Sequence, residues 1–497
     1  MIVAFFVILF AIFPLTDTDI WWHLACAREW VTTWTPVRMP IVNVHEYFQL
    51  AVGFVYGLGG APLLVAFKAV LWGVVFALFV GPQKIKFNAQ SLLKLSFVIL
   101  VLLLLRHLFE VRPVLFSLLF LGVYWNILPW LAQKCRESGS SVKLVACVAL
   151  ILAIQWLWCK CQGLYILGPI FATLVLSANL FESKKQGALC KKSVVFQVAF
   201  VLILWSMPFL HREGLALFLY PFGLLDRLLG LTPSATAFAS QIAENRSPIT
   251  LLMAGENCIA SVTMIVLSLA GAGTACWRLY KNRRPDALNV TVVMAAILAL
   301  VAERNFVLFL PVLFGSFYSK CILGFHSSLL SVKNDCSKKT LLITNHCLLS
   351  TVYFLLPTFF IFGLWARSLF AYDMSMVAYQ RVPVDATAWM QKHPHSGKLF
   401  NDDRAGGYLA LMNPTESIYI DGRFILKTAD FFERYLNYAK DAALFMHDAD
   451  SLGIDRALFP LQYYARWDEL MSALDRDSRW QLVYRDEYFA IFDKIIK

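Results

Sequence analysis

The sequence predicts an α-helical polytopic membrane protein, with about eleven transmembrane helices and a soluble α/β domain at its C-terminal end. Of its 497 residues, 59% are hydrophobic and 15% are charged, which is too apolar for a soluble multidomain protein. Residues 368–497 hold 15 basic and 19 acidic residues, whereas the whole chain has a net charge of +11. A basic membrane part, residues 1–367, therefore precedes a slightly acidic domain, and the basic charge reflects membrane topology rather than binding to nucleic acid.

Eleven apolar segments are long enough to cross, or nearly cross, a hydrocarbon core of about 30 Å. The first has neither a basic n-region nor a small-residue cleavage site, so we expect a membrane span there rather than a cleaved signal peptide. The segments fall at about 1–14, 58–80, 92–105, 114–132, 144–158, 164–180, 194–210, 256–276, 288–302, 306–319 and 346–366.

The charges of the connecting loops indicate the orientation. If the N-terminus is cytoplasmic, the cytoplasmic loops hold 18 basic and only four acidic residues; these loops are 81–94, 133–143, 181–193, 277–287 and 320–345. This bias follows the positive-inside rule. We therefore expect a multi-pass protein of the cytoplasmic (inner) membrane, with long outer loops at 15–57 and 211–255 and an extracytoplasmic C-terminal domain at 368–497.

The C-terminal domain alternates helical and β-rich segments, which is typical of a small α/β layer domain. We expect helices near 384–393, 429–446 and 467–475, and strands near 398–402, 416–421, 456–460, 481–485 and 488–493. Asp402, Asp421 and Arg423 follow predicted strands, where ligands gather in α/β layers. Turn chemistry explains these residues equally well.

The acidic pair Asp17 and Asp19 directly follows the first apolar segment, at the outer membrane surface. Charges at such a position favour function, since one carboxylate can accept a proton while the other orients a substrate or holds a metal. The alternative is that an aspartate caps the helix that follows. The spacing of Trp22 and Trp34 predicts that this helix lies along the membrane interface.

His23, His45 and Glu46 share the first outer loop with the acidic pair, and we expect them to bind substrate there. Their spacing matches no zinc motif. A loosely held divalent cation with oxygen ligands, Mg²⁺ or Mn²⁺, agrees better with Asp17 and Asp19 as ligands. Polar residues of a solvated loop are the competing explanation.

Four cations lie within or at the ends of apolar segments, namely Lys68, Arg106, Arg112 and Arg304. Cations at such depths need acidic partners or an anionic ligand. Glu110, Glu256 and Glu303 could supply structural ion pairs. A phosphate site is the alternative, because Arg binds phosphate through two parallel hydrogen bonds.

Together these residues resemble the GT-C superfamily of integral membrane glycosyltransferases, and more closely an uncharacterised bacterial group of GT-C-like proteins. The chain departs from the family in the threonine between its two acids and in the Cys159–Gly163 turn, where the bacterial group has a His-Gly type of turn. The landmarks are Asp17-Thr-Asp19-Ile-Trp21-Trp22-His23-Leu24, His45-Glu46, Arg112-Pro113-Val-Leu-Phe-Ser117, Tyr220-Pro221-Phe222-Gly223, Arg304-Asn305, Gly406-Gly407-Tyr408-Leu409 and Ile420-Asp421-Gly422-Arg423.

The resemblance implies a hexosyl- or pentosyltransferase that uses a polyprenyl-phosphate sugar donor and a glycan, lipid or protein acceptor. It implies that Asp17 or Asp19 is the catalytic acid position of the first outer loop, without deciding between them. Two other functions compete. One is a transporter or lipid-handling protein without catalysis, although the chain lacks the repeated halves of many transporters. The other is a polysaccharide polymerase or ligase.

Overall fold

The computed structural model describes residues 2–39, 41–82, 89–136, 142–187, 190–229, 242–282, 286–328, 355–356, 358–462 and 465–495. The chain divides into two compact units, each built from separate stretches of sequence. The helical unit comprises 1–13, 65–221 and 242–372, and the second unit comprises 14–64, 222–241 and 373–497. The first outer loop, which the sequence analysis grouped with the membrane part, therefore shares a unit with the C-terminal domain.

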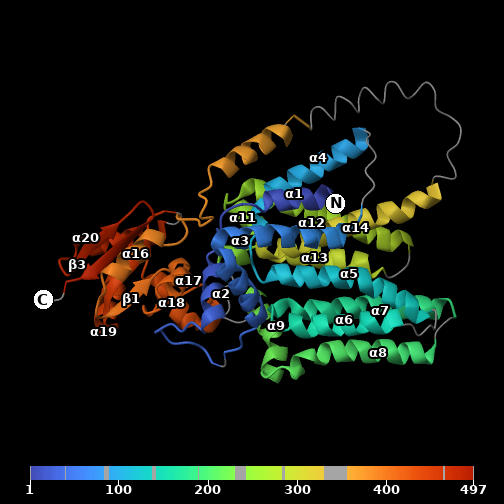
Figure 1. The fold of residues 1–497 in the computed structure, drawn as a ribbon, viewed down its shortest axis with the longest axis horizontal. Helices are drawn as coiled ribbons and strands as arrows, with labels where there is room; N and C mark the ends of the chain where they lie inside the picture. The colour runs from blue at the N-terminus through green and yellow to red at the C-terminus, as the bar shows by residue number, and fades with distance from the viewer. Residues whose placement is uncertain are drawn as a thin grey trace. The chain divides into compact units, whose positions relative to one another are not determined.

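Apolar helices make up the helical unit (Figure 1). Helices α5 to α8 pack against one another, and α12, α13 and α14 form a second group of neighbours. The helices are α1 (Ile2–Phe10), the end of α3 (Glu46–Val80), α4 (Ala89–Leu104), α5 (Val114–Arg136), α6 (Val142–Trp158), α7 (Leu167–Lys185), α8 (Lys191–Ser206), α9 (Gly214–Leu229, whose last residues fall in the second unit), α11 (Pro248–Met253), α12 (Cys258–Asn282), α13 (Ala287–Val301) and α14 (Phe306–Ser328).

Among the described residues, five helices are long and apolar enough to cross a membrane, as judged by length and composition. They are Glu46–Val80, Val114–Cys135, Gly163–Lys185, Lys191–Leu210 and Cys258–Asn282. Five shorter apolar helices are Leu93–Leu104, Val142–Trp158, Gly214–Leu224, Ala287–Val301 and Thr358–Phe370. A many-helix membrane fold is thus confirmed, and the number eleven stays a prediction.

Large apolar side chains face outward from this unit. Val195 and Leu202 in α8 and Ile259 in α12 are all more than half exposed. Lipid tails are as apolar as these side chains, so a helix in a bilayer loses little by exposing them. All five predicted basic loops lie partly outside the described residues, and for 320–345 only the helical backbone up to Ser328 is described.

Helix α3 is interrupted where its two halves meet. Gly59 and Gly60 have non-helical backbone angles, and Gly60 has φ +64°, which residues with a side chain rarely adopt. Pro62 follows within the same helix and removes a backbone donor. The residues after this kink continue as a predominantly apolar helix to Val80.

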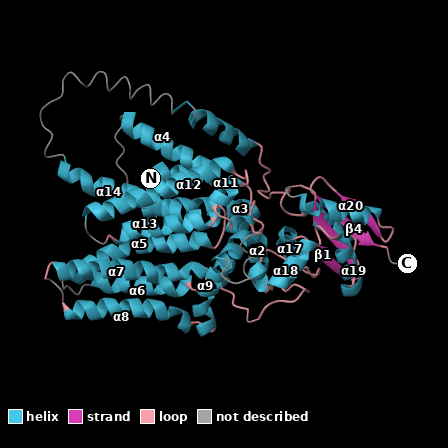
Figure 2. Ribbon diagram, turned by 180° about the vertical axis from the view of Figure 1, so that it is seen from behind, coloured by secondary structure: helices cyan, strands magenta, loops and turns pink. Residues whose placement is uncertain are grey.

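The second unit contains a mixed four-stranded sheet in the order β1-β2-β4-β3 (Figure 2). Strands β1 (Lys398–Asn401) and β2 (Ile454–Pro460) are parallel, and β3 (Trp480–Arg485) and β4 (Phe489–Lys494) complete the sheet in antiparallel fashion. The predicted α/β layer domain is confirmed. Its helices are α16 (Val384–Lys392), α17 (Asp403–Met412), α18 (Ala429–Asn437), α19 (Ala442–Leu452) and α20 (Asp468–Arg476).

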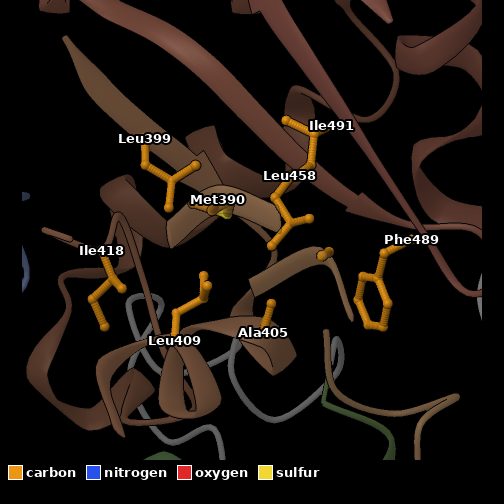
Figure 3. Close-up of a cluster of buried hydrophobic side chains, with 9 residues drawn as sticks. Met390, Leu399, Ala405, Leu409, Ile418, Leu458, Phe489 and Ile491 are labelled. Carbon is orange, nitrogen blue, oxygen red and sulfur yellow. The ribbon is translucent and has the colours of Figure 1, made fainter. Parts of the chain in front are cut away.

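One buried cluster of this sheet domain is built from apolar side chains. Leu399 of β1, Leu458 of β2 and Ile491 of β4 meet Met390 of α16 and Leu409 of α17, all at most 2% exposed (Figure 3). Alternate residues of each strand point to the same face, which is why the strand and helix residues can form one layer. Val31 from the first outer loop packs against this cluster. The loop therefore contributes to the core of the domain.

Three expectations for this unit were wrong. Residues 416–421 form no strand, because Asn401 accepts a hydrogen bond from the backbone N–H of Tyr419 and donates one to the carbonyl of Ile420, both at 2.8 Å. The segment 429–446 is two helices, since Asp441 caps a new helix through the backbone N–H of Leu444. The helix at the first outer loop, α2 (Asp19–Arg28), ends before Trp34.

Candidate functional site

The acidic pair stands at the beginning of α2. Asp17 is buried and accepts a hydrogen bond from the backbone N–H of Asp19, at 3.3 Å. Asp19 is the first residue of the helix, and its Oδ1 accepts a hydrogen bond from the indole N–H of Trp22 at 3.1 Å. A carboxylate that bonds a free N–H at a helix start stabilises that start. Asp17 therefore makes the capping contact at the beginning of α2.

Helix α2 lies directly on α17 of the C-terminal domain, with little room between the two backbones. A Cβ placed on Gly407 would lie 2.7 Å from the backbone nitrogen of Trp22, and one placed on Gly406 would overlap the carbonyl of Ile420. The rings of Trp21 and Tyr408 meet edge to face, with centroids 5.0 Å apart. Gly407 thus faces the acidic helix, whereas Gly406 faces the backbone of Ile420.

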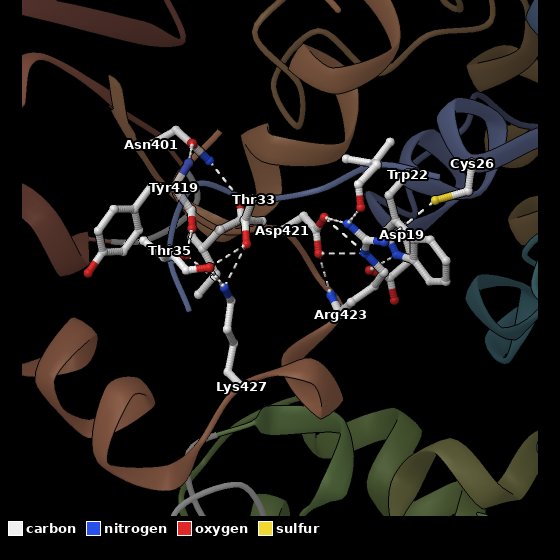
Figure 4. Close-up of polar contacts among 12 residues, drawn as sticks. Asp19, Trp22, Cys26, Thr33, Thr35, Asn401, Tyr419, Asp421, Arg423 and Lys427 are labelled. Carbon is white, nitrogen blue, oxygen red and sulfur yellow. Dashed lines mark hydrogen bonds and ion pairs between the residues drawn. The ribbon is translucent and has the colours of Figure 1, made fainter. Parts of the chain in front are cut away.

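The landmark Asp421-Gly422-Arg423 reaches the same helix from another side (Figure 4). Nε of Arg423 donates to both carboxylate oxygens of Asp421 at 3.0 Å, and Nη2 donates to the carbonyl of Val31 at 2.9 Å. Nη1 contacts Cys26 Sγ of α2 at 3.6 Å. The guanidinium also lies over the rings of Trp22 and Trp30, 5.5 and 5.0 Å from their centroids.

Burial and the neighbouring groups shift the pKa of Arg423 in opposite directions. Burial would lower its pKa, but the carboxylates of Asp421 and Asp19 and the thiol of Cys26 outweigh burial and raise the pKa. Only 4% of its side chain is exposed. Asp421 is buried as well. The pair is therefore a buried, charged hydrogen-bonding unit next to the acidic helix.

The rest of the first outer loop is held by a buried lysine that the sequence analysis missed (Figure 4). Nζ of Lys427 donates to Thr33 Oγ1 at 2.8 Å, to Thr35 Oγ1 at 2.6 Å and to the carbonyl of Pro36 at 3.1 Å. Burial lowers its pKa to about 8. A lysine four residues after the Asp-Gly-Arg landmark was the only signal in the sequence.

The two histidines of the loop lie together in an aromatic group. The rings of His23 and Trp22 have centroids 3.5 Å apart, and His23 meets His45 at 5.2 Å and Phe48 at 4.9 Å. His23 is buried. Glu46 is the first residue of α3. The two histidines therefore pack around α2, and the predicted role of His23, His45 and Glu46 in substrate binding stays a prediction.

Asp402 belongs to a different group, at the carboxyl end of β1. It accepts hydrogen bonds from the backbone N–H of Arg404 at 3.1 Å, from Nε of Arg404 at 2.8 Å and from Trp467 Nε1 at 2.7 Å. Burial would raise the pKa of Asp402, but the charges of Arg404 and Arg466 and these hydrogen bonds hold it below its ordinary value. Asp402 thus caps α17 within an ion-pair network.

The four predicted phosphate-binding cations lie in the helical unit. Arg112 forms a bidentate ion pair with Glu244, at 2.7 and 2.6 Å, an acidic partner that the sequence did not predict. Lys68 donates to the carbonyl of Phe13 at 3.2 Å and lies 3.4 Å from the centroid of its ring. Arg106 bonds the hydroxyl of Tyr372. Arg304 lies in the turn Glu303–Asn305.

The residues do not fit a complete metal site. Within the described ranges, no group of three or more His, Cys, Asp and Glu side chains is placed to hold a metal ion. Asp17 and Asp19 supply two carboxylates, whereas Mg²⁺ and Mn²⁺ favour octahedral oxygen sites.

Comparisons with known proteins identify the fold. No protein-family model and no curated protein matches the chain. Among solved structures, it is similar to the archaeal oligosaccharyltransferase AglB from Archaeoglobus fulgidus in complex with an inhibitory peptide and a dolichol-phosphate, with 12% identity, a TM-score of 0.50 and coverage of 92% of this chain and 68% of that one.

Two other structures of the Archaeoglobus fulgidus oligosaccharyltransferase give the same result. The apo form has 11% identity and a TM-score of 0.53, and the alignment covers 92% of this chain and 69% of that one. The complex with Zn and sulfate has 10% identity and a TM-score of 0.50, with coverage of 92% and 67%. The similarity extends over nearly the whole chain, and at this identity it is a similarity of fold.

Proposed function

Because the chain has the fold of the GT-C superfamily of membrane glycosyltransferases, we propose that it is a membrane glycosyltransferase. In this proposal a sugar passes from a polyprenyl-phosphate-linked donor to an acceptor on the outer face of the cytoplasmic membrane. The observation that carries it is the acidic pair at the beginning of α2, held by hydrogen bonds to Asp17 and Asp19. A general base needs a carboxylate in a fixed position.

The proposed reaction is a single displacement. An aspartate, Asp17 or Asp19, removes the proton from the acceptor hydroxyl, and the oxygen attacks the anomeric carbon of the sugar. The bond between that carbon and the phosphate oxygen breaks, and its electron pair leaves on the polyprenyl phosphate. Cations that neutralise the leaving phosphate lower the barrier.

For the leaving phosphate we propose Lys68, Arg106, Arg112 and Arg304, whose turns or spans the sequence places at the outer side of the membrane. A lipid-linked donor agrees with one of the similar structures, which holds a dolichol-phosphate and an inhibitory peptide. Its long apolar chain would reach the protein from within the bilayer. The acceptor remains a glycan, a lipid or a protein.

The test uses the full-length protein, purified and reconstituted in lipid nanodiscs. Farnesyl phosphates that carry radiolabelled hexoses or pentoses serve as donors, and cell-envelope fractions serve as acceptors. At least one of Asp17→Asn and Asp19→Asn is expected to lower the transfer rate by about 10²- to 10⁴-fold, the usual contribution of a general base. Asp450→Asn, a change at an exposed ion pair, is the matched control.

Transfer at the parental rate by both folded variants would contradict the proposed site. If the unaltered protein transfers no sugar from any of these donors, then the proposed reaction itself is wrong. Measuring donor hydrolysis in parallel separates a missing acceptor from an inactive enzyme, because water can replace the acceptor hydroxyl. Circular dichroism and size-exclusion chromatography establish that each variant is folded.

A further inference from the structure

The Asp-Gly-Arg segment of the C-terminal domain lies against the acidic helix at Asp19. A Cβ placed on Gly422 would overlap Asp19 Oδ1 and would lie 3.5 Å from Trp22 Nε1. Any residue larger than glycine would therefore press on the carboxylate itself. The charge of Arg423 also interacts with Asp19. One segment thus contacts the aspartate sterically and acts on it electrostatically.

Arg423 is not available as a surface ligand. Asp421 holds one edge of its guanidinium, the carbonyl of Val31 takes a further N–H, and the Cys26 thiol lies next to the remaining nitrogen. Such an arrangement fixes the orientation of a guanidinium, whose donors form a rigid planar fork. The sequence predicted that Arg423 binds substrate, and the burial of its side chain argues against that role.

We propose that Arg423 is a positioning residue, which Asp421 orients and which, together with Trp22, fixes the Asp19 carboxylate for proton transfer. Gly422 provides the space that this carboxylate occupies. The inference rests on the proposed function and deepens it, because it assigns the base to Asp19 rather than Asp17. It also gives the C-terminal domain a part in the reaction without contact with the substrate.

The inference predicts a particular response to small changes. Displacing a catalytic carboxylate by a fraction of an ångström to 1 Å lowers turnover by up to about 100-fold without changing the affinity for the donor. Removing a neighbouring positive charge makes ionisation of a carboxyl group less favourable. Among the described residues, the charged groups close to Asp19 include Asp17, two residues before it, and Asp421, which is paired with Arg423.

The first experiment introduces a steric change without a change in charge. Gly422→Ala is expected to lower kcat at least tenfold and to leave KM for the farnesyl-phosphate sugar within about twofold of the parental value. Gly57→Ala is the matched control, since a Cβ on Gly57 of α3 meets no atom within 4 Å. Trp22→Phe, which keeps an aromatic ring but loses the N–H donor to Asp19, is the second variant if Gly422→Ala fails to fold.

The second experiment compares the dependence of kcat on pH. In Arg423→Gln, the acidic limb of the profile is expected at higher pH than in the parental protein, because Asp19 has lost a neighbouring cation. Arg423→Lys keeps the positive charge but loses the planar fork of donors. We therefore expect its acidic limb to lie near the parental pH, while its kcat stays below the parental value. If Arg423 had a purely structural role, its replacement would change the protein yield and the unfolding temperature, but the acidic limb of the kcat profile would stay at the parental pH.

The outcomes distinguish this inference from the proposed function. It is overturned if folded Gly422→Ala, Trp22→Phe and Arg423→Gln keep the parental kcat and pH profile while Asp19→Asn is inactive. If Asp19→Asn is active and Asp17→Asn is inactive, the transferase proposal stands but the base is Asp17 and the inference is wrong. If both Asn variants are active, the proposed site fails and the inference fails with it.

Discussion

Gly407 of α17 lies directly against the backbone nitrogen of Trp22 in α2, close enough that a single methyl group would not fit between them. We expect Gly407→Ala to destabilise the protein by about 1–3 kcal/mol, the usual cost of overpacking a close contact. The measurement is thermal unfolding, together with amide hydrogen exchange of residues 20–25. Faster exchange should be confined to α2, and Gly57→Ala should leave it unchanged.

Arg456 and Asp493 pair across β2 and β4, with Nε to Oδ1 at 2.7 Å and Nη2 to Oδ2 at 2.6 Å. Only 2% of the Arg456 side chain is exposed, so Asp493→Ala would leave a buried cation without its carboxylate. We expect a loss of roughly 3 kcal/mol in the free energy of unfolding. Asp450→Ala, at exposed pairs with Arg479 and Lys494, should change the free energy of unfolding much less than Asp493→Ala does.

His395 gives the second unit a pH-dependent stability. It lies between Glu416, at 3.1 Å, and Asp455. Burial would lower its pKa, but these two carboxylates outweigh burial and raise the pKa above the ordinary 6.5. Because the folded pKa is the higher one, the stabilisation is complete below about pH 6.5 and is lost as the pH rises through the folded pKa.

The His395→Asn variant tests this relation. The difference in unfolding temperature between the parental protein and His395→Asn should be largest near pH 6 and should shrink as the pH rises toward about 9. His447→Asn, a change at an exposed histidine of α19, is the control. A difference that does not vary with pH would contradict the assignment.

Arg112 and Glu244 offer a test of phosphate binding. If the donor phosphate binds Arg112, it competes with the carboxylate that now holds both guanidinium nitrogens. Glu244→Gln should then lower KM for the farnesyl-phosphate sugar severalfold, and Arg112→Gln should raise it. Glu256→Gln, which affects the pair with Arg246, is the matched control. Equal KM values in all three variants would exclude Arg112 from donor binding.

Local patterns in the sequence were sufficient to predict much of the fold. Apolar runs predicted a many-helix membrane protein, the alternating tail predicted the sheet domain, and the resemblance to GT-C enzymes is confirmed at the level of the fold. The helix α17 was missed because Gly406 and Gly407 each disfavour a helix by about 1 kcal/mol. Its cap, Asp402, was the signal that could have revealed it.

The arrangement of the candidate site could not be predicted in the same way. Residues 416–421 have a local β-rich pattern, but their backbone groups bond to distant parts of the chain instead of a neighbouring strand. The side chain of Asn401 accepts from the backbone N–H of Tyr419, and the backbone N–H of Trp34, in the first outer loop, donates to the carbonyl of Ile418 at 3.1 Å. The landmark residues were recognised individually, whereas the contact between Asp19 and Gly422 spans about 400 residues. No local period encodes such a contact.

The large sequence separation between α2 and its partners affects the order in which the protein is made. A ribosome makes α2 and the segment that follows it long before their partners, which lie between Leu399 and Lys427. Throughout the insertion of the intervening helices, the acidic helix lacks these partners. We therefore expect a chain that stops before Asp373 to insert into the membrane but to leave α2 sensitive to protease, and the separately supplied domain 373–497 to restore its protection.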